Sequence, residues 1–140
     1  MRKLLLALLF AWAGALCAVP AHAQIIIIAS PNMNVDSITK DELHDIFTGA
    51  STNFRLGLCA KPVLLKEGAA HNEFLAGYIG IRDVQFRSNW RGLLFAGQRS
   101  IPPSFDTEAQ MVEFVAHNLF IIGYIHRATP HEGVRVLQVK

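Results

Sequence analysis

Histidines are common metal ligands and proton carriers, and this 140-residue chain has six of them. No two of them have the HExxH spacing, which places two metal ligands and a base on one helix face. We therefore expect surface or capping roles for them, with no metal site and no cofactor. Beyond the first 23 residues the set is His44, His71, His117, His126 and His131.

The candidate nucleophiles lack the context that catalysis needs. Ser30 and Ser104 do not lie in the GxSxG pattern of a nucleophile elbow. Cys59 would need a histidine and an acid brought to it by the fold, and a small semi-buried thiol is the simpler reading. The sequence therefore favours a protein that is not an enzyme.

Anion binding fits the sequence better than catalysis does. Open α/β sheets bind ligands beyond the carboxyl ends of their strands, where helix N-termini present unpaired N–H groups. Two segments follow expected strands in this way, and nearby arginines, Arg87, Arg91 and Arg99, could grip an anion. The candidate anion-binding residues are Ser30 and Asn32 in the first segment, Gly68, Ala69, Ala70 and His71 in the second, and Arg91.

The first 23 residues have the pattern of a signal peptide. Arg2 and Lys3 precede an apolar run from Leu4 to Val19, and Ala21-His22-Ala23 matches a signal-peptidase site. An uncleaved anchor is the alternative, but the run is shorter than the roughly 20 residues that span a bilayer. Lipid attachment at Cys17 is a further alternative, disfavoured by the large Leu16 before it. We expect residues 1–23 to be cleaved and the protein to be periplasmic.

Cleavage would leave 117 residues, Gln24 to Lys140, enough for a single domain with its own core. The leader carries two of the 13 Lys and Arg residues, so 11 would remain against 11 Asp and Glu. This balance gives no reason to expect nucleic acid or a membrane surface as a partner. Cys59 would be the single remaining cysteine, which excludes an internal disulfide.

The apolar pattern predicts strands separated by helices. Ile25 to Ala29 is expected to be a central buried strand, and Thr39 with Glu42 marks the start of a capped helix. The segment 50–61 is expected to be an irregular loop, followed by a strand at 62–66 and a helix that starts near Gly68.

The second half of the chain continues this alternation. Asp83 is expected to cap a helix that ends at Phe95, and Thr107 with Gln110 to cap the next, whose apolar face runs to Leu119. Strands are expected at 120–125 and 134–139, the last at an edge, with Trp90 and Tyr124 in the core. The order indicates an α/β fold with a mainly parallel sheet flanked by helices.

Several motifs in this order resemble a known family. They are ITKDELHDIFTG, SNWRGLLFAGQRSIPP and the FIIGYI strand, and they resemble short periplasmic proteins related to the phosphate-binding components of ABC transporters. The resemblance covers nearly all of residues 24–140 and implies one lobe of the type-2 periplasmic-binding-protein fold. It implies a phosphate-like anion as ligand and an ABC permease as partner.

Two departures from the family bear on function. The resemblance implies a Ser-Gly-Thr where this chain has Gly68, Ala69 and Ala70, and an arginine where it has Leu64. The two-lobed relatives are also about twice as long, and one lobe alone encloses little of a ligand. We therefore expect weak or lost anion binding, with phosphate no tighter than millimolar. The alternative is a non-enzymatic envelope interaction module that keeps the fold as a scaffold for docking another envelope protein.

Overall fold

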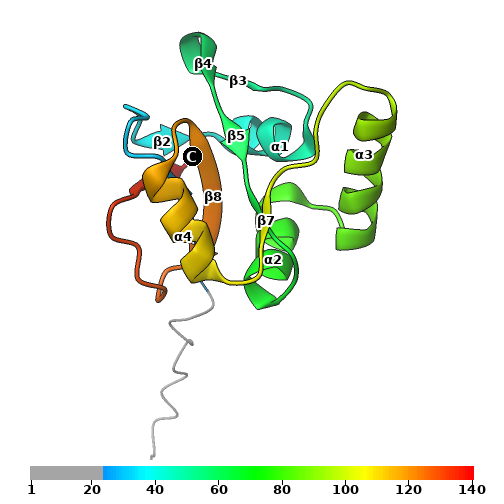
Figure 1. Cartoon of the computed structure of the whole chain (residues 1–140). Helices are drawn as coiled ribbons and strands as arrows, with labels where there is room; N and C mark the ends of the chain where they lie inside the picture. Colours follow the sequence, from blue (N-terminus) through cyan, green and yellow to red (C-terminus); the bar gives the residue numbers. More distant parts are fainter. Residues whose placement is uncertain (1–23) are drawn as a thin grey trace, which may run out of the picture.

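A computed structural model describes residues 24–140, and its centre is one five-stranded sheet (Figure 1). The chain has an α/β fold, as expected, and residues 24–140 contain this sheet and four α-helices. From edge to edge the strands are β2 (Ser37–Ile38), β9 (Arg135–Val139), β1 (Ile25–Ala29), β8 (Ile121–His126) and β5 (Lys61–Pro62). Strand β1 therefore lies in the middle of the sheet, as its isoleucines predicted.

The sheet is mixed, and the expectation of a mainly parallel sheet was wrong. β1 pairs antiparallel with both β8 and β9, whereas only the short strands β2 and β5 pair parallel with their neighbours. β9 is also not an edge strand, because β2 pairs along its outer side. All five residues of β1 are buried, since both faces of the sheet are covered.

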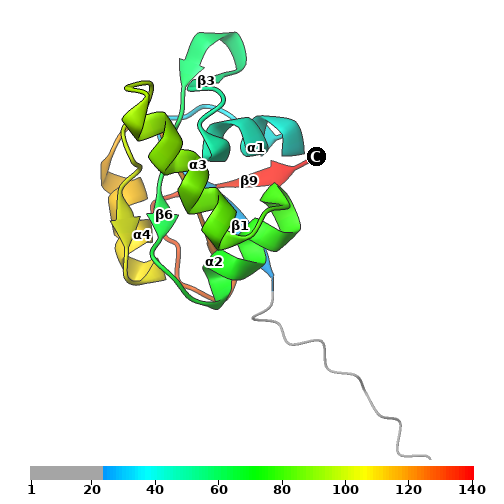
Figure 2. The same cartoon turned by 90° about the vertical axis from the view of Figure 1, so that its right-hand side faces the viewer.

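Helices cover both faces of the sheet (Figures 1 and 2). Gly123 of β8 faces α4, where an added Cβ would lie 2.8 Å from Met111 Sδ. The next residue, Tyr124, points to the opposite face, because side chains alternate along a strand. There its ring stacks on Phe74 and meets Phe47 edge-on. The helices are α1 (Lys40–Thr48), α2 (Ala69–Phe74), α3 (Asp83–Phe95) and α4 (Glu108–His117).

Two helices begin with the caps that the sequence predicts. Thr39 and Glu42 form a reciprocal capping box at α1, and Thr107 and Gln110 form another at α4. Leu119 was wrongly expected on the apolar face of α4, because the helix ends at His117 and Leu119 is 65% exposed. Helix α2 runs on as a π-helical segment, η3 (Leu75–Ile79), and ends at Gly80.

The connections contain short strands that the pattern did not separate. Residues 50–61, expected to be an irregular loop, hold a small hairpin with an exposed Cys59. Its parts are β3 (Asn53–Phe54), η2 (Arg55–Gly57) and β4 (Leu58–Cys59). The strand expected at 62–66 is divided, because β5 joins the main sheet whereas β6 (Leu64–Leu65) pairs with β7 (Ser104–Phe105).

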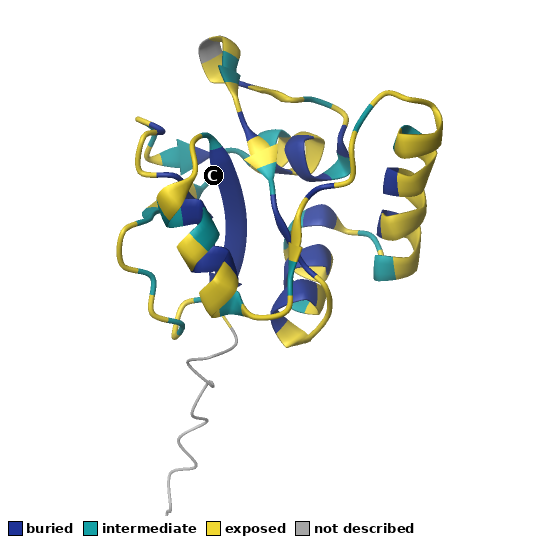
Figure 3. Cartoon of the chain, viewed as in Figure 1, coloured by how far each residue is buried: buried dark blue, intermediate teal, exposed yellow. Residues whose placement is uncertain are grey.

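Helix α3 is the least covered helix (Figure 3). Of its 13 residues, Phe86 and Trp90 are the two that are buried. The Trp90 indole donates to the carbonyl of Phe47, 2.9 Å away, which ties α3 to the end of α1. Trp90 and Tyr124 are both core residues, as predicted. No helix within residues 24–140 is long and apolar enough to cross a membrane.

Candidate functional site

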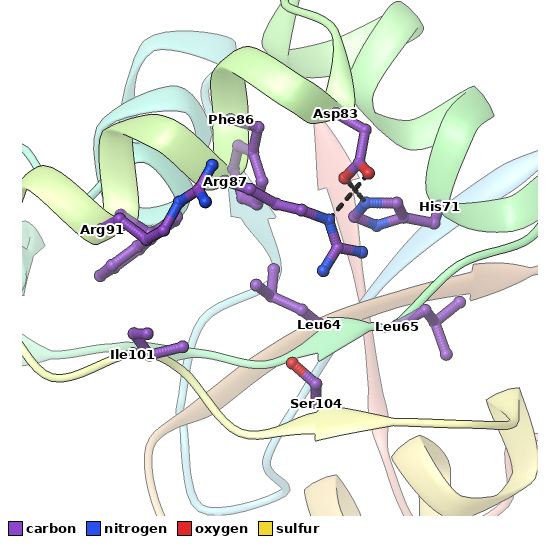
Figure 4. Close-up of a pocket in the computed structure, with 10 residues that line it drawn as sticks. Leu64, Leu65, His71, Asp83, Phe86, Arg87, Arg91, Ile101 and Ser104 are labelled. Atoms are coloured by element: carbon purple, nitrogen blue, oxygen red, sulfur yellow. Dashed lines mark hydrogen bonds and ion pairs between the residues drawn. The ribbon is translucent and has the colours of Figure 1, made fainter.

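A pocket of about 300 Å³ lies between α3 and the small sheet of β6 and β7 (Figure 4). This volume is at the lower end of the range for small-molecule sites. Its lining combines apolar side chains with a few polar ones, which is the usual composition of a ligand site. The lining residues are Leu64, Leu65, His71, Asp83, Phe86, Arg87, Trp90, Arg91, Ile101 and Ser104.

His71 is the buried polar residue of the pocket, with 2% of its surface exposed. Its Nδ1 lies 2.5 Å from the Tyr124 hydroxyl and its Nε2 lies 2.7 Å from a carboxylate oxygen of Asp83. The Tyr124 oxygen also accepts from the backbone N–H of Leu65 at 2.9 Å. A neutral His71 with its proton on Nε2 satisfies all of these groups, because Tyr124 then donates to Nδ1.

Asp83 is shared between His71 and Arg87. The Arg87 Nε donates to the second oxygen of Asp83 at 2.8 Å, and an Arg87 Nη donates to the carbonyl of Lys66. Burial alone would raise the pKa of Asp83, but its bonds to His71 and Arg87 outweigh burial and lower that pKa. Asp83 is therefore ionised near neutral pH, and it forms an ion pair with Arg87.

Arg91 is a cationic residue of the pocket that forms no ion pair with an acidic residue within residues 24–140. No hydrogen-bond or ion-pair partner of Arg91 is found within residues 24–140, and Figure 4 shows it one turn further along α3 than Arg87. Ser104 lies across the pocket on β7 and adds a hydroxyl. An anion in this pocket would find one free guanidinium and one hydroxyl, and it would also face the carboxylate of Asp83.

Of the predicted segment from Gly68 to His71, His71 lines this pocket, and the three residues before it do not. Gly68 has a φ of 106°, and no side chain caps the helix at this end. A serine at this position would be strained, so the Ser-Gly-Thr of the family would need a different local backbone. Ala70 is buried, so only backbone N–H groups near Gly68 and Ala69 remain for an anion.

The other predicted segment, Ser30 to Asn32, does not line this pocket. The buried Ser30 hydroxyl donates to the carbonyl of Asn118 at 2.6 Å and accepts from the N–H of Ile121 at 2.8 Å. The Asn32 side chain accepts from the N–H of Phe120, whose φ is +59°. Both side chains hold the turn between α4 and β8. The fold therefore separates the two predicted segments, and Arg99 also lies outside the pocket lining.

Two important residues of the site, Asp83 and Tyr124, could not be recognised as such from the sequence. Asp83 was expected to cap α3, but Arg82 holds the cap position and Asp83 instead accepts from His71, 12 residues earlier. Tyr124 was expected as core alone, yet its hydroxyl completes the His71 network. The expected surface or capping role of His71 was wrong because this network satisfies the ring inside the core. Among the described residues no group of His, Cys, Asp and Glu suits a metal ion.

Solved structures with a similar fold were found by comparison with known proteins. No family model matches the chain, and no curated protein matches its sequence. A protein assigned as a phosphate ABC transporter substrate-binding protein, with bound phosphate, from Clostridium perfringens matches over 82% of this chain with a TM-score of 0.63 and 21% identity. PstS from Borrelia burgdorferi matches over 83% with a TM-score of 0.59 and 19% identity.

A third structure agrees with these two. An ABC-type phosphate transport receptor from Vibrio cholerae matches over 82% of this chain, with a TM-score of 0.53 and 16% identity. The chain covers 44%, 47% and 45% of the three longer proteins in the order given. At this level of identity the likeness shows the fold. The chain therefore has the structure of about half, or one lobe, of a phosphate-type substrate-binding protein.

Proposed function

We propose that this chain is a periplasmic solute-binding-type protein whose single lobe binds a phosphate-like anion weakly, in the pocket between α3 and β6–β7. The observation that supports this most is that Arg91 and His71, which lies in the first turn of α2, line one pocket. Both were candidate anion-binding features of the sequence. The solved structures of the same fold include one with bound phosphate.

The expected affinity follows from the groups that remain free. One charge-assisted hydrogen bond contributes about 1.5–3 kcal/mol. The helix end near Gly68 contributes roughly 0.3–1 kcal/mol toward an exposed anion. The nearby carboxylate of Asp83 opposes binding, and His71 and Arg87 already have partners. A total of about 2–4 kcal/mol corresponds to a dissociation constant of millimolar or weaker.

Isothermal titration with sodium phosphate at low ionic strength tests this proposal. We expect weak binding to the parent chain and no measurable binding to Arg91→Ala. Arg99→Ala is the matched control, because Arg99 lies outside the pocket lining and its loss should leave the weak binding intact. Micromolar affinity, or binding that survives Arg91→Ala, would contradict the proposal.

The cellular location is part of the same proposal. A cleaved leader ending at Ala23 would deliver the protein to the periplasm, where an ABC permease could receive its ligand. The intact mass of protein recovered from the periplasm is the test. We expect a chain that begins at Gln24, and a mass that includes residues 1–23 or a lipid on Cys17 would contradict it.

An interaction module that binds no solute is the second candidate. The exposed apolar residues of α3 favour it, because Val84 is 77% and Phe95 is 84% exposed. In this case phosphate has no effect in the titration, and the fold acts as a scaffold that presents α3 to another protein.

A further inference from the structure

Half of the residues that line the pocket between α3 and β6–β7 are apolar. Four of them are buried, whereas Ile101, on the segment that leads to β7, is 49% exposed (Figure 4). An inorganic anion binds through hydrogen-bond donors alone, so it would leave this apolar surface in contact with water. A ligand with an apolar part would cover it. The apolar lining residues are Leu64, Leu65, Phe86, Trp90 and Ile101.

The arginines and the carboxylate of the pocket leave one positive charge uncompensated. Asp83 and Arg87 form an ion pair, with 2.8 Å between the Arg87 Nε and a carboxylate oxygen. Arg87 also donates to the carbonyl of Lys66. Arg91, one turn further along α3, has no such partner within residues 24–140. A single negative charge on the ligand therefore balances the pocket, whereas a second one would be repelled by Asp83 without a cation to offset it.

The free hydrogen-bond donors of the pocket are few. The Arg91 guanidinium lies on α3, and the Ser104 hydroxyl lies across the pocket on β7 (Figure 4). These two groups can serve the two oxygens of a carboxylate, whose planar shape matches a guanidinium. A phosphate has more oxygens, and each one that loses water without gaining a donor costs free energy. The number of donors therefore favours a carboxylate over a phosphate.

We propose that this pocket binds a monocarboxylate with a small apolar body, with the carboxylate at Arg91 and Ser104 and the body against the apolar lining. The volume of about 300 Å³ is at the lower end of the range for ligand sites, which suits one ring or a short alkyl chain. This inference rests on the proposed anion site, and it narrows the ligand of that site to an organic carboxylate.

A cationic ligand fits the same pocket less well. Both oxygens of Asp83 are already bonded, one to His71 and the other to Arg87. A ligand cation would also meet the like charge of Arg91. A neutral apolar ligand would cover the apolar lining but would leave the Arg91 charge without a partner. Only an apolar anion uses both features of the pocket.

Trp90 gives a direct signal for binding, because it lines the pocket and is the only tryptophan of the chain from Gln24 to Lys140. We expect titration of this chain with phenylacetate at pH 7 to change the emission of Trp90. Phenylacetate should bind at least tenfold more tightly than acetate, since each buried methylene group strengthens binding about fourfold. Phenylacetamide keeps the ring but not the charge, and it should bind at least tenfold more weakly than phenylacetate.

Two variants test the two halves of the pocket. Arg91→Gln should weaken phenylacetate binding at least tenfold, and Arg99→Gln, outside the lining, is its matched control. Ile101→Ser should weaken phenylacetate binding several-fold and leave acetate binding unchanged. Leu119→Ser is the control for this second variant, because Leu119 is also an exposed apolar side chain but lies outside the pocket. Circular dichroism should show all four variants folded.

The ligand series separates this inference from the proposed anion site. Phosphate binding that depends on Arg91, together with phenylacetate that binds no more tightly than acetate, would overturn the inference and leave the anion site standing. Phenylacetamide that binds as tightly as phenylacetate would overturn the role of the carboxylate, and binding that survives both Arg91→Gln and Ile101→Ser would overturn the location. If phenylacetate, acetate and phosphate all fail to bind, both proposals are wrong.

Discussion

Two histidines, His71 under α3 and His126 at the end of β8, each lie between two partners but in opposite electrostatic settings. His71 is bonded to the hydroxyl of Tyr124 and to the carboxylate of Asp83. His126 has a carboxylate on each side, with Glu73 2.8 Å from its Nε2 and Glu108 3.3 Å from its Nδ1. The first histidine completes a buried hydrogen-bond network, whereas the second lies between two carboxylates that favour its charged form.

The difference should appear as opposite responses to pH. At the His71 site the pKa of Asp83 is lowered, so its contribution to stability is present above the ordinary value of 3.8 and is lost as pH falls through the folded-state pKa. At the other site, burial alone would lower the pKa of His126, but Glu73 and Glu108 outweigh burial and raise it. That contribution is present below about 6.5 and is lost as pH rises through the folded-state pKa.

The largest effect should come from removing the packing that holds the His71 site together. Trp90→Ala should lower the free energy of unfolding by about 3–5 kcal/mol, because it opens a large cavity and removes the bond to the Phe47 carbonyl. Asp83 lies on the same helix, so the loosened α3 should also hold it less firmly against His71. Denaturant titration measures the loss.

Asn89→Ala is the control for this prediction, because Asn89 is exposed on the same helix and should change the free energy of unfolding by less than about 0.5 kcal/mol. An unfolding midpoint for Trp90→Ala within error of the parent would mean that polar contacts alone position α3.

The sequence predicted the features whose signals are local. The capping boxes at Thr39 and Thr107 depend on residues three positions apart, and β1 is central because an unbroken apolar strand must be covered on both faces. The direction of strand pairing, parallel or antiparallel, has no such local signal. Helices between strands suggested a parallel sheet, but β1 is paired with strands that lie more than 90 residues later.

The residues of the candidate site likewise fall into those that could be predicted from the sequence and those that could not. His71 and Arg91 were both read from the sequence as candidates, and both line one pocket, whereas the small residues before His71 do not. The bond between His71 and Asp83 could not be read, because the two lie on separate helices and their meeting depends on the turn at Gly80. The division of residues 61–65 between two sheets could not be predicted either, because β6 pairs with β7, which is about 40 residues later in the chain.

The acid response should distinguish the two histidine sites next. Asp83→Asn should cost about 1 kcal/mol at neutral pH, near the upper end for a partly exposed ion pair, and less as pH falls below 4. The stabilities of Asp83→Asn and the parent should therefore approach each other at acid pH, and thermal unfolding from pH 2.5 to 7 measures the difference. Glu132→Gln removes an exposed carboxylate and should leave the profile unchanged. A constant gap between Asp83→Asn and the parent across the range would show that Asp83 contributes through shape and not through charge.

The smallest effect should be the alkaline response of the His126 site. His126→Gln keeps a side chain that can hydrogen-bond to Glu73 and Glu108, but it removes the charge that titrates. The parent should lose stability between pH 6 and 9, by roughly 1 kcal/mol or less for a site this close to the surface, while the variant should stay nearly flat. His117→Gln, at an exposed position on α4, should follow the parent. If His126→Gln keeps the slope of the parent, the charge on His126 does not stabilise the fold. The two histidine sites would then differ in burial, and the ion pairs at the end of β8 would give no alkaline response.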